Sequence, residues 1–102
     1  MSDTLPQISV DELAALTDRT VIDVREPDEY ANGHVPGARN LPLATIRTHA
    51  DELGEVGPVH VICQSGRRST QATEVLRAVG VDAVNVSGGT TAWIDAGKPV
   101  ER

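Results

Sequence analysis

The chain has 102 residues, of which 39% are hydrophobic and 24% are charged, and its formal net charge is -6 at pH 7. This length and composition predict one globular domain that spans residues 1–102. The acidic balance argues against nucleic acid or an anionic membrane as a partner, because both bind preferentially to basic surfaces.

The N-terminal stretch MSDTLPQISVDEL lacks the basic segment and the apolar run of a secretory signal. No window of the sequence approaches the roughly 18 apolar residues that a membrane-spanning helix needs. The chain has one cysteine, Cys63, so that no internal disulfide can form. These features together predict a cytoplasmic protein.

Short apolar runs alternate with segments of helical periodicity, which predicts an α/β fold with a central, mainly parallel β-sheet flanked by helices. In the first half we expect a helix opened by a capping box at 9–12, a strand at 20–24, a helix from 27 to the Asn32-Gly33 stop, a short strand at 38–41 and a helical stripe from 43 to 53. In the second half we expect a strand at 59–63, a helix from about 68 to 80, a strand at 81–86 and, after a Gly88-Gly89 turn, a helix ending at 97.

The stretch VHVICQSGRRST places Cys63 at the carboxyl end of a predicted strand, directly before a predicted helix. In open α/β sheets this edge is where ligands bind. Gly66 permits an unusual turn, and the helix N-terminus and two adjacent arginines favour a thiolate over a thiol. A small buried cysteine that only ends a strand would not need such polar and cationic neighbours. We therefore expect Cys63 to be a reactive nucleophile.

Three stretches of the sequence resemble the rhodanese-like sulfurtransferase family. The loop CQSGRRS is similar to the family's active-site loop, and VIDVREPDEYANGHVPGARNLPL and VNVSGGTTAWIDAGKPV are similar to its N-terminal and C-terminal signatures. The resemblance covers the chain from about residue 8 to 100. It implies a rhodanese-like fold and a sulfurtransferase that carries sulfane sulfur as a persulfide on Cys63, with no metal and no organic cofactor.

The resemblance also implies the partners and the substrate-binding residues. Sulfur would come from thiosulfate or a persulfide donor, including a persulfide-relay protein, and would pass to a thiol, cyanide or a protein acceptor. Either loop arginine could face a sulfonate-like anion. The implied substrate-binding loop is Gln64, Ser65, Gly66, Arg67 and Arg68.

Two other functions remain as alternatives. Dual-specificity phosphatases share this fold but have five residues between cysteine and arginine, whereas this loop has four and places Ser69 at the phosphatase position. The loop also departs from the CGSGT or CGAGT pattern of mercaptopyruvate sulfurtransferases. A binding or regulatory module that uses the fold without turnover is the second alternative. A disulfide oxidoreductase is excluded, because it needs a second cysteine.

Three further residues are expected to support the loop from outside it: Asp23, Arg25 and Ser69. Asp23 could bond to the loop backbone and Arg25 could add charge, although an Arg25 ion pair with Asp28 or Glu29 is the preferred alternative. His34 is expected to shape a bend in the chain. The three histidines and one cysteine show no spacing typical of a metal site.

Overall fold

The computed structural model describes residues 5–102. The first four residues, which belong to the stretch searched for a secretory signal, lie outside the described residues. The strands are β1 (Gln7–Ile8), β2 (Thr20–Asp23), β3 (Arg39–Asn40), β4 (Val59–Ile62) and β5 (Ala83–Val86). The helices are α1 (Val10–Ala15), α2 (Pro27–Ala31), the 3₁₀ helix η1 (Leu43–His49), α3 (Ala50–Leu53), α4 (Arg67–Ala78) and α5 (Gly89–Asp95).

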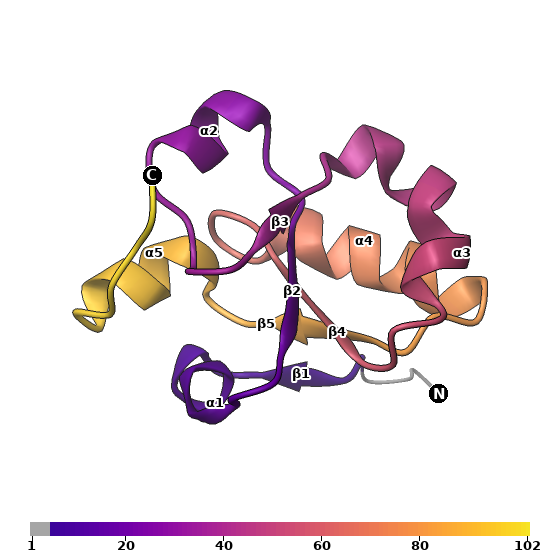
Figure 1. Cartoon of the computed structure of the whole chain (residues 1–102), viewed down its shortest axis with the longest axis horizontal. Helices are drawn as coiled ribbons and strands as arrows, with labels where there is room; N and C mark the ends of the chain where they lie inside the picture. Colours follow the sequence, from indigo (N-terminus) through magenta and orange to yellow (C-terminus); the bar gives the residue numbers. More distant parts are fainter. Residues whose placement is uncertain (1–4) are drawn as a thin grey trace.

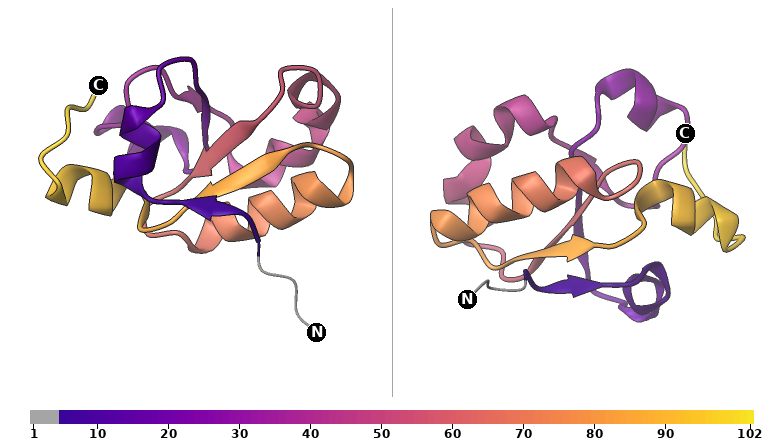
Figure 2. Two further views of the ribbon diagram at one scale, coloured as in Figure 1. Left: turned by 90° about the horizontal axis from the view of Figure 1, so that it is seen from below. Right: turned by 180° about the vertical axis from the view of Figure 1, so that it is seen from behind.

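The five strands form one sheet in the order β1-β5-β4-β2-β3, and all four strand pairs are parallel. Helices cover both faces of this sheet, with α3 and α4 on one side and α1 and α5 on the other (Figures 1 and 2). The predicted α/β architecture with a parallel central sheet is therefore confirmed. No helix of residues 5–102 is long and apolar enough to cross a membrane.

The helices and strands differ from the sequence prediction at two places. The strand β1 was not predicted, because two residues are too few to show an alternating pattern. The stripe from 43 to 53 is a 3₁₀ helix that becomes α-helical only at Ala50. In this 3₁₀ segment the Thr45 and Thr48 hydroxyls donate to carbonyls three residues earlier, an arrangement compatible with the tighter 3₁₀ turn.

Apolar side chains pack on both faces of the sheet, which explains why the central strands read as continuous hydrophobic runs. Successive residues of a strand point to opposite faces, so that Val61 packs with η1, α3 and α4 while Ile62 packs with α1 and α5. Trp93 is buried in this second cluster, and its indole N–H donates to the Pro99 carbonyl at 2.7 Å. The sheet is thus a rigid support for the loops at its carboxyl edge.

The order of the strands determines where a ligand site can form. From β2 the chain continues to β3 on one side of the sheet, and from β4 it continues to β5 on the other side. The direction of the connections therefore reverses between the carboxyl ends of β2 and β4. Cys63 follows β4 directly, and Arg25 lies two residues after β2. In open α/β sheets, ligands bind at such a switch point.

Candidate active site

Cys63 lies at the floor of an open pocket at the carboxyl edge of the sheet. The pocket measures about 440 Å³ and its other lining residues are Ser65, Arg67, Arg68 and Gln71. Only 1% of the Cys63 surface is exposed, whereas Ser65 and Arg67 are exposed at the rim. A substrate therefore reaches the sulfur through a mouth lined by polar and cationic side chains.

The Cys63 sulfur is surrounded by hydrogen-bond donors from the N-terminus of α4. The Gly66 N–H donates to Sγ at 3.1 Å, and the buried Ser69 hydroxyl lies 3.4 Å from Sγ. Burial by itself raises the pKa of the thiol, but the Ser69 hydroxyl and the N–H groups of Ser69, Gly66 and Ser65 together outweigh it. The pKa of Cys63 therefore lies below its ordinary value. The direction agrees with the thiolate that the sequence predicts.

The first turn of α5 holds the backbone of the Cys63 loop in place. The Cys63 carbonyl accepts hydrogen bonds from the Thr90 N–H at 2.8 Å and from the Thr90 hydroxyl at 3.1 Å. The Gln64 carbonyl accepts from the Thr91 N–H at 3.0 Å. In a trans peptide the C=O and N–H groups point in opposite directions. The two N–H groups that follow these carbonyls are therefore turned away from α5.

Gly89 makes this close approach of α5 to the loop possible. A Cβ atom at Gly89 would lie 2.5 Å from the Gln64 carbonyl oxygen and 2.6 Å from the Cys63 carbonyl oxygen. Its φ of +64° is also in the left-handed region that favours glycine. The sequence predicted only a turn at Gly88-Gly89; the contact between this turn and the loop is visible only in the folded chain.

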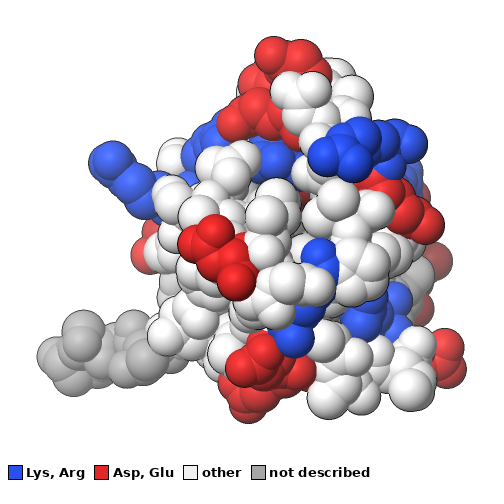
Figure 3. Space-filling model, turned by 90° about the vertical axis from the view of Figure 1, so that its left-hand side faces the viewer, with Lys and Arg blue, Asp and Glu red and all other residues white. Residues whose placement is uncertain are grey.

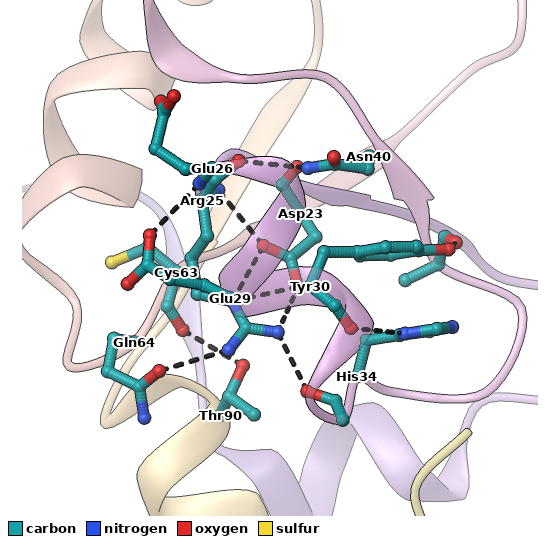
Figure 4. A network of polar contacts seen from close by, with 12 residues as sticks. Asp23, Arg25, Glu26, Glu29, Tyr30, His34, Asn40, Cys63, Gln64 and Thr90 are labelled. Carbon is teal, nitrogen blue, oxygen red and sulfur yellow. Dashed lines mark hydrogen bonds and ion pairs between the residues drawn. The ribbon is translucent and has the colours of Figure 1, made fainter. Parts of the chain in front are cut away.

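Arg25 joins the end of β2 to the loop after β4 (Figure 4). Its guanidinium binds both carboxylate oxygens of Asp23, with the shortest distance 2.8 Å, and donates to Gln64 Oε1 at 3.0 Å. The predicted pair of Arg25 with Asp28 or Glu29 is therefore wrong. Asp23 is the ion-pair partner of the guanidinium because the two side chains lie at the same edge of the sheet. Asp23 has no exposed surface there.

Glu29 instead pairs with Arg68, the last residue of the predicted loop. The two side chains form two parallel hydrogen bonds of 2.7 and 2.9 Å. The Arg68 guanidinium, together with the Glu26 N–H, lowers the pKa of Glu29 from 4.5 to about 2. Arg67 is exposed and has no ion pair within residues 5–102. Of the two arginines that the sequence left open, Arg67 is the one without an acidic partner.

The structure thus brings the predicted loop and its predicted supporting residues together at one edge of the sheet. The Asp23 carboxylate, however, accepts hydrogen bonds from Arg25 and not from the loop backbone, as the sequence suggested it could. Sequence reasoning missed Glu29, Gly89, Thr90 and Thr91 as neighbours of the loop. The two threonines and Gly89 lie within the stretch that resembles the C-terminal family signature, which is the signal that could have indicated them. Within the described part of the chain, no group of three His, Cys, Asp or Glu side chains could hold a metal ion.

His34 lies on the other side of the Arg25 network and shapes the chain after α2. Its Nδ1 lies 2.8 Å from the Tyr30 carbonyl oxygen, and its ring stacks on the Tyr30 ring with centroids 3.6 Å apart. This geometry confirms the expected structural role in the bend.

The face of the molecule that lies to the left in Figure 1 carries interspersed acidic and basic side chains, with no continuous basic surface among the residues described there (Figure 3).

The comparison with known protein families agrees with this geometry. The model of the rhodanese-like domain matches residues 9–96. The chain belongs to the rhodanese-like family. Relatives and structural neighbours named as sulfurtransferases support sulfur transfer as the activity at the level of this family.

Three relatives illustrate the range of the family. A sulfurtransferase of Allochromatium vinosum is 37% identical over 89 residues, which cover 86% of this chain and 83% of the relative. An uncharacterized protein of Bacillus subtilis, YqhL, is 40% identical over 74 residues, 72% of this chain and 59% of the relative. A putative sulfur carrier protein of the same organism, YrkF, is 35% identical over 95 residues, 88% of this chain and 51% of the relative. The chain thus spans only part of the length of the two Bacillus relatives.

Two solved structures show the same fold. A rhodanese-like domain protein from Staphylococcus aureus has a TM-score of 0.81 at 34% identity, over 87% of this chain and 91% of the other. The human single-domain sulfurtransferase TSTD1 has a TM-score of 0.80 at 28% identity, over 90% of this chain and 97% of the other. The rhodanese-like fold of this chain is therefore established.

Proposed function

We propose that Cys63 carries sulfane sulfur as a persulfide, which it takes from thiosulfate or a persulfide donor and gives to a thiol, to cyanide or to a protein acceptor. The observation that supports this most directly is the position of Sγ, at the floor of the pocket and within 3.1 Å of the Gly66 N–H. The Gly66 N–H and the other hydrogen-bond donors around Sγ lower the pKa of the thiol and are suited to hold an anionic sulfur atom.

In the first half-reaction, the Cys63 thiolate attacks the outer sulfur of thiosulfate. A bond forms between Sγ and that sulfur, the sulfur–sulfur bond of thiosulfate breaks, and sulfite leaves with the electron pair. The cysteine persulfide keeps one negative charge, which the loop N–H groups can stabilise. Arg67, exposed at the rim without an acidic partner, is placed to bind the sulfonate oxygens.

In the second half-reaction, an acceptor nucleophile attacks the outer sulfur of the persulfide. The sulfur–sulfur bond to Cys63 breaks, the thiolate is regenerated, and the outer sulfur leaves on the acceptor. With cyanide the product is thiocyanate. No metal and no organic cofactor takes part in this proposed cycle. A cytoplasmic location stays a prediction of the sequence.

Two observations weigh against the alternatives. In the phosphatase arrangement an arginine would occupy position 69, but here Ser69 is fully buried and its hydroxyl lies beside Sγ. A binding module without turnover would not need a lowered thiol pKa at the floor of an accessible pocket.

Intact-mass spectrometry tests the proposal. Incubation with thiosulfate should add one sulfur atom to the protein, and cyanide should then remove it and release thiocyanate. The Cys63→Ser variant should take up no sulfur. A wild-type protein that gains no sulfur from thiosulfate or from a low-molecular-weight persulfide would refute the sulfurtransferase proposal. Hydrolysis of an aryl phosphate that depends on Cys63 would instead favour the phosphatase alternative.

A further inference from the structure

A second pocket adjoins the one that holds Cys63. It measures about 520 Å³ and shares two lining residues, Arg68 and Gln71, with the Cys63 pocket. It continues along α4 to the neighbouring helix η1, and the two helices lie side by side in the view from behind (Figure 2). We call this region the α4–η1 groove and define it by Leu43, Ile46, Arg47, Gln71 and Val75. The groove therefore borders the Cys63 pocket at Arg68 and Gln71.

The groove is larger and less polar than thiosulfate or cyanide requires. Pockets of about 300–1,000 Å³ bind ligands of the size of drugs and cofactors rather than ions of a few atoms. Its floor is apolar, because Ile46 is buried and Leu43 and Val75 are half-buried there. An occupant that gains from this floor must carry an apolar segment.

Arg47 adds a positive charge to this groove and does not line the Cys63 pocket. Its side chain is exposed and has no ion pair within residues 5–102, whereas Arg68 is paired with Glu29. Glu26 also lines the groove and is its one acidic side chain. A carboxylate at Arg47 would gain an ion pair at no cost to an existing one.

We propose that the α4–η1 groove binds the sulfur acceptor, and that this acceptor is a thiol whose apolar stem ends in a carboxylate. The thiol lies at Cys63, the stem lies over Leu43 and Val75, and the carboxylate pairs with Arg47. This assignment rests on the proposed function, because it concerns the second half-reaction. Arg47 is then a residue that determines acceptor specificity and takes no part in the chemical step.

The transfer conserves atoms and charge. The acceptor thiolate attacks the outer sulfur of the Cys63 persulfide and forms a new sulfur–sulfur bond. The bond between this sulfur and Sγ breaks, and its electron pair stays on Cys63 as the thiolate. The product is the persulfide anion of the acceptor, with no external oxidant or reductant.

The test isolates the second half-reaction in a single turnover. The protein is loaded with sulfur from thiosulfate, freed of excess donor, and mixed with increasing concentrations of 6-mercaptohexanoate or 6-mercaptohexanol. These thiols have the same stem and differ in the terminal charge. Intact mass gives the rate at which Cys63 loses the added sulfur, and hence the half-saturating concentration of each thiol.

The variants for this test are Arg47→Gln and, as a matched control, Arg39→Gln. Arg39 is also an exposed arginine, but it pairs with Glu52 and does not line the groove. We expect wild type to saturate at a roughly three- to tenfold lower concentration of the carboxylate thiol than of the alcohol. Arg47→Gln should abolish this preference, and Arg39→Gln should keep it.

Three outcomes would overturn the assignment. Equal half-saturating concentrations of the two thiols in wild type would show that the groove does not select a carboxylate. A preference that persists in Arg47→Gln would place the anion-binding group elsewhere. Failure of Cys63 to take up sulfur in the loading step, from thiosulfate and from a low-molecular-weight persulfide alike, would refute the proposed function itself, and the acceptor assignment with it. The loading step is scored separately and therefore distinguishes this failure from the other two.

Discussion

Arg25 Nη1 donates a hydrogen bond of 3.0 Å to Gln64 Oε1 and so connects two segments that lie 39 residues apart in the chain. The same guanidinium is held by Asp23, and both members of this ion pair are buried. At its other end the Gln64 amide donates to the Thr91 hydroxyl at 2.8 Å. The residue directly after Cys63 is therefore fixed between β2 and α5.

The first prediction concerns this buried ion pair. Arg25→Met should destabilise the protein by about 3–5 kcal/mol, because it leaves the Asp23 carboxylate buried without a partner. The double variant Asp23→Asn/Arg25→Met should recover much of this loss, since no buried charge remains. Chemical denaturation gives the free energy of unfolding for each variant.

Activity separates stabilisation of the fold from positioning of the loop. In the double variant Gln64 Oε1 still lacks the hydrogen bond from the Arg25 guanidinium. We therefore expect sulfur uptake from thiosulfate to stay slower than in wild type even where the protein is fully folded. Recovery of both stability and sulfur uptake would show that Arg25 acts on the fold alone.

The second prediction concerns the hydroxyl beside the sulfur. Ser69→Ala removes a hydrogen bond that favours the Cys63 thiolate, so that the pKa of the thiol should rise. Alkylation by iodoacetamide at pH 7 should slow by roughly tenfold, because a hydrogen bond to a charged group contributes about 1.5 kcal/mol and about 1.4 kcal/mol corresponds to a factor of ten. The midpoint of the alkylation rate against pH should move upward.

Ser65→Ala is the matched control for this variant. Ser65 also lies beside Cys63, but it is its backbone N–H that lowers the pKa of the thiol, and alanine keeps that group. An equal upward shift in both variants would contradict a specific role for the Ser69 hydroxyl.

The third prediction follows from the Glu29–Arg68 pair. The pKa of Glu29 is lowered in the folded protein to about 2 from an ordinary 4.5, so that the pair stabilises the fold above pH 4.5 and loses this effect as the pH falls through 2. Because the two side chains are about one-third exposed, we expect Glu29→Gln to cost only about 1 kcal/mol or less at pH 7.

The measurement is the difference in unfolding free energy between wild type and Glu29→Gln at several pH values. The difference should be constant from pH 7 to 5 and should shrink below pH 4.5. Glu74→Gln is the control, since Glu74 is an exposed residue of α4 with no ion pair within the described residues. A difference that grows toward low pH would contradict the assigned direction.

The fourth prediction concerns the contact between α5 and the loop. Gly89→Ala should destabilise the protein by roughly 3 kcal/mol or more and should also slow sulfur uptake, because the added Cβ would overlap the Cys63 and Gln64 carbonyls. Thermal unfolding and the sulfur-uptake assay measure the two effects.

Gly97→Ala separates the overlap from backbone strain. Gly97 has a similar φ of +77°, but a Cβ there meets no atom within 4 Å. Its substitution should cost only the roughly 1–2 kcal/mol of a left-handed conformation. If both variants lost the same stability and Gly89→Ala kept full sulfur uptake, the close approach of α5 would not be needed to shape the loop.

The local sequence determined most of the secondary structure and the place of the nucleophile. The capping box of Ser9 and Glu12, the Pro27 start of α2 and the apolar periods of β4 and α4 act between residues close in the chain. Such signals do not depend on how distant segments pack. For the same reason, the position of Cys63 between a strand and a helix could be predicted from the stretch around it.

Only the tertiary structure decided which charged groups meet. Asp23, Asp28 and Glu29 are all close to Arg25 in the sequence, and the sequence alone favoured the wrong ones. Asp23 binds Arg25 because both lie at the buried carboxyl end of β2. Glu29 pairs with Arg68 because α2 faces the start of α4 across the site. Likewise, the fit of Gly89 under the loop and the groove between α4 and η1 arise from the packing of segments far apart in the chain. Ion pairs and close approaches depend on distances between folded segments, and local periodicity carries no information about those distances.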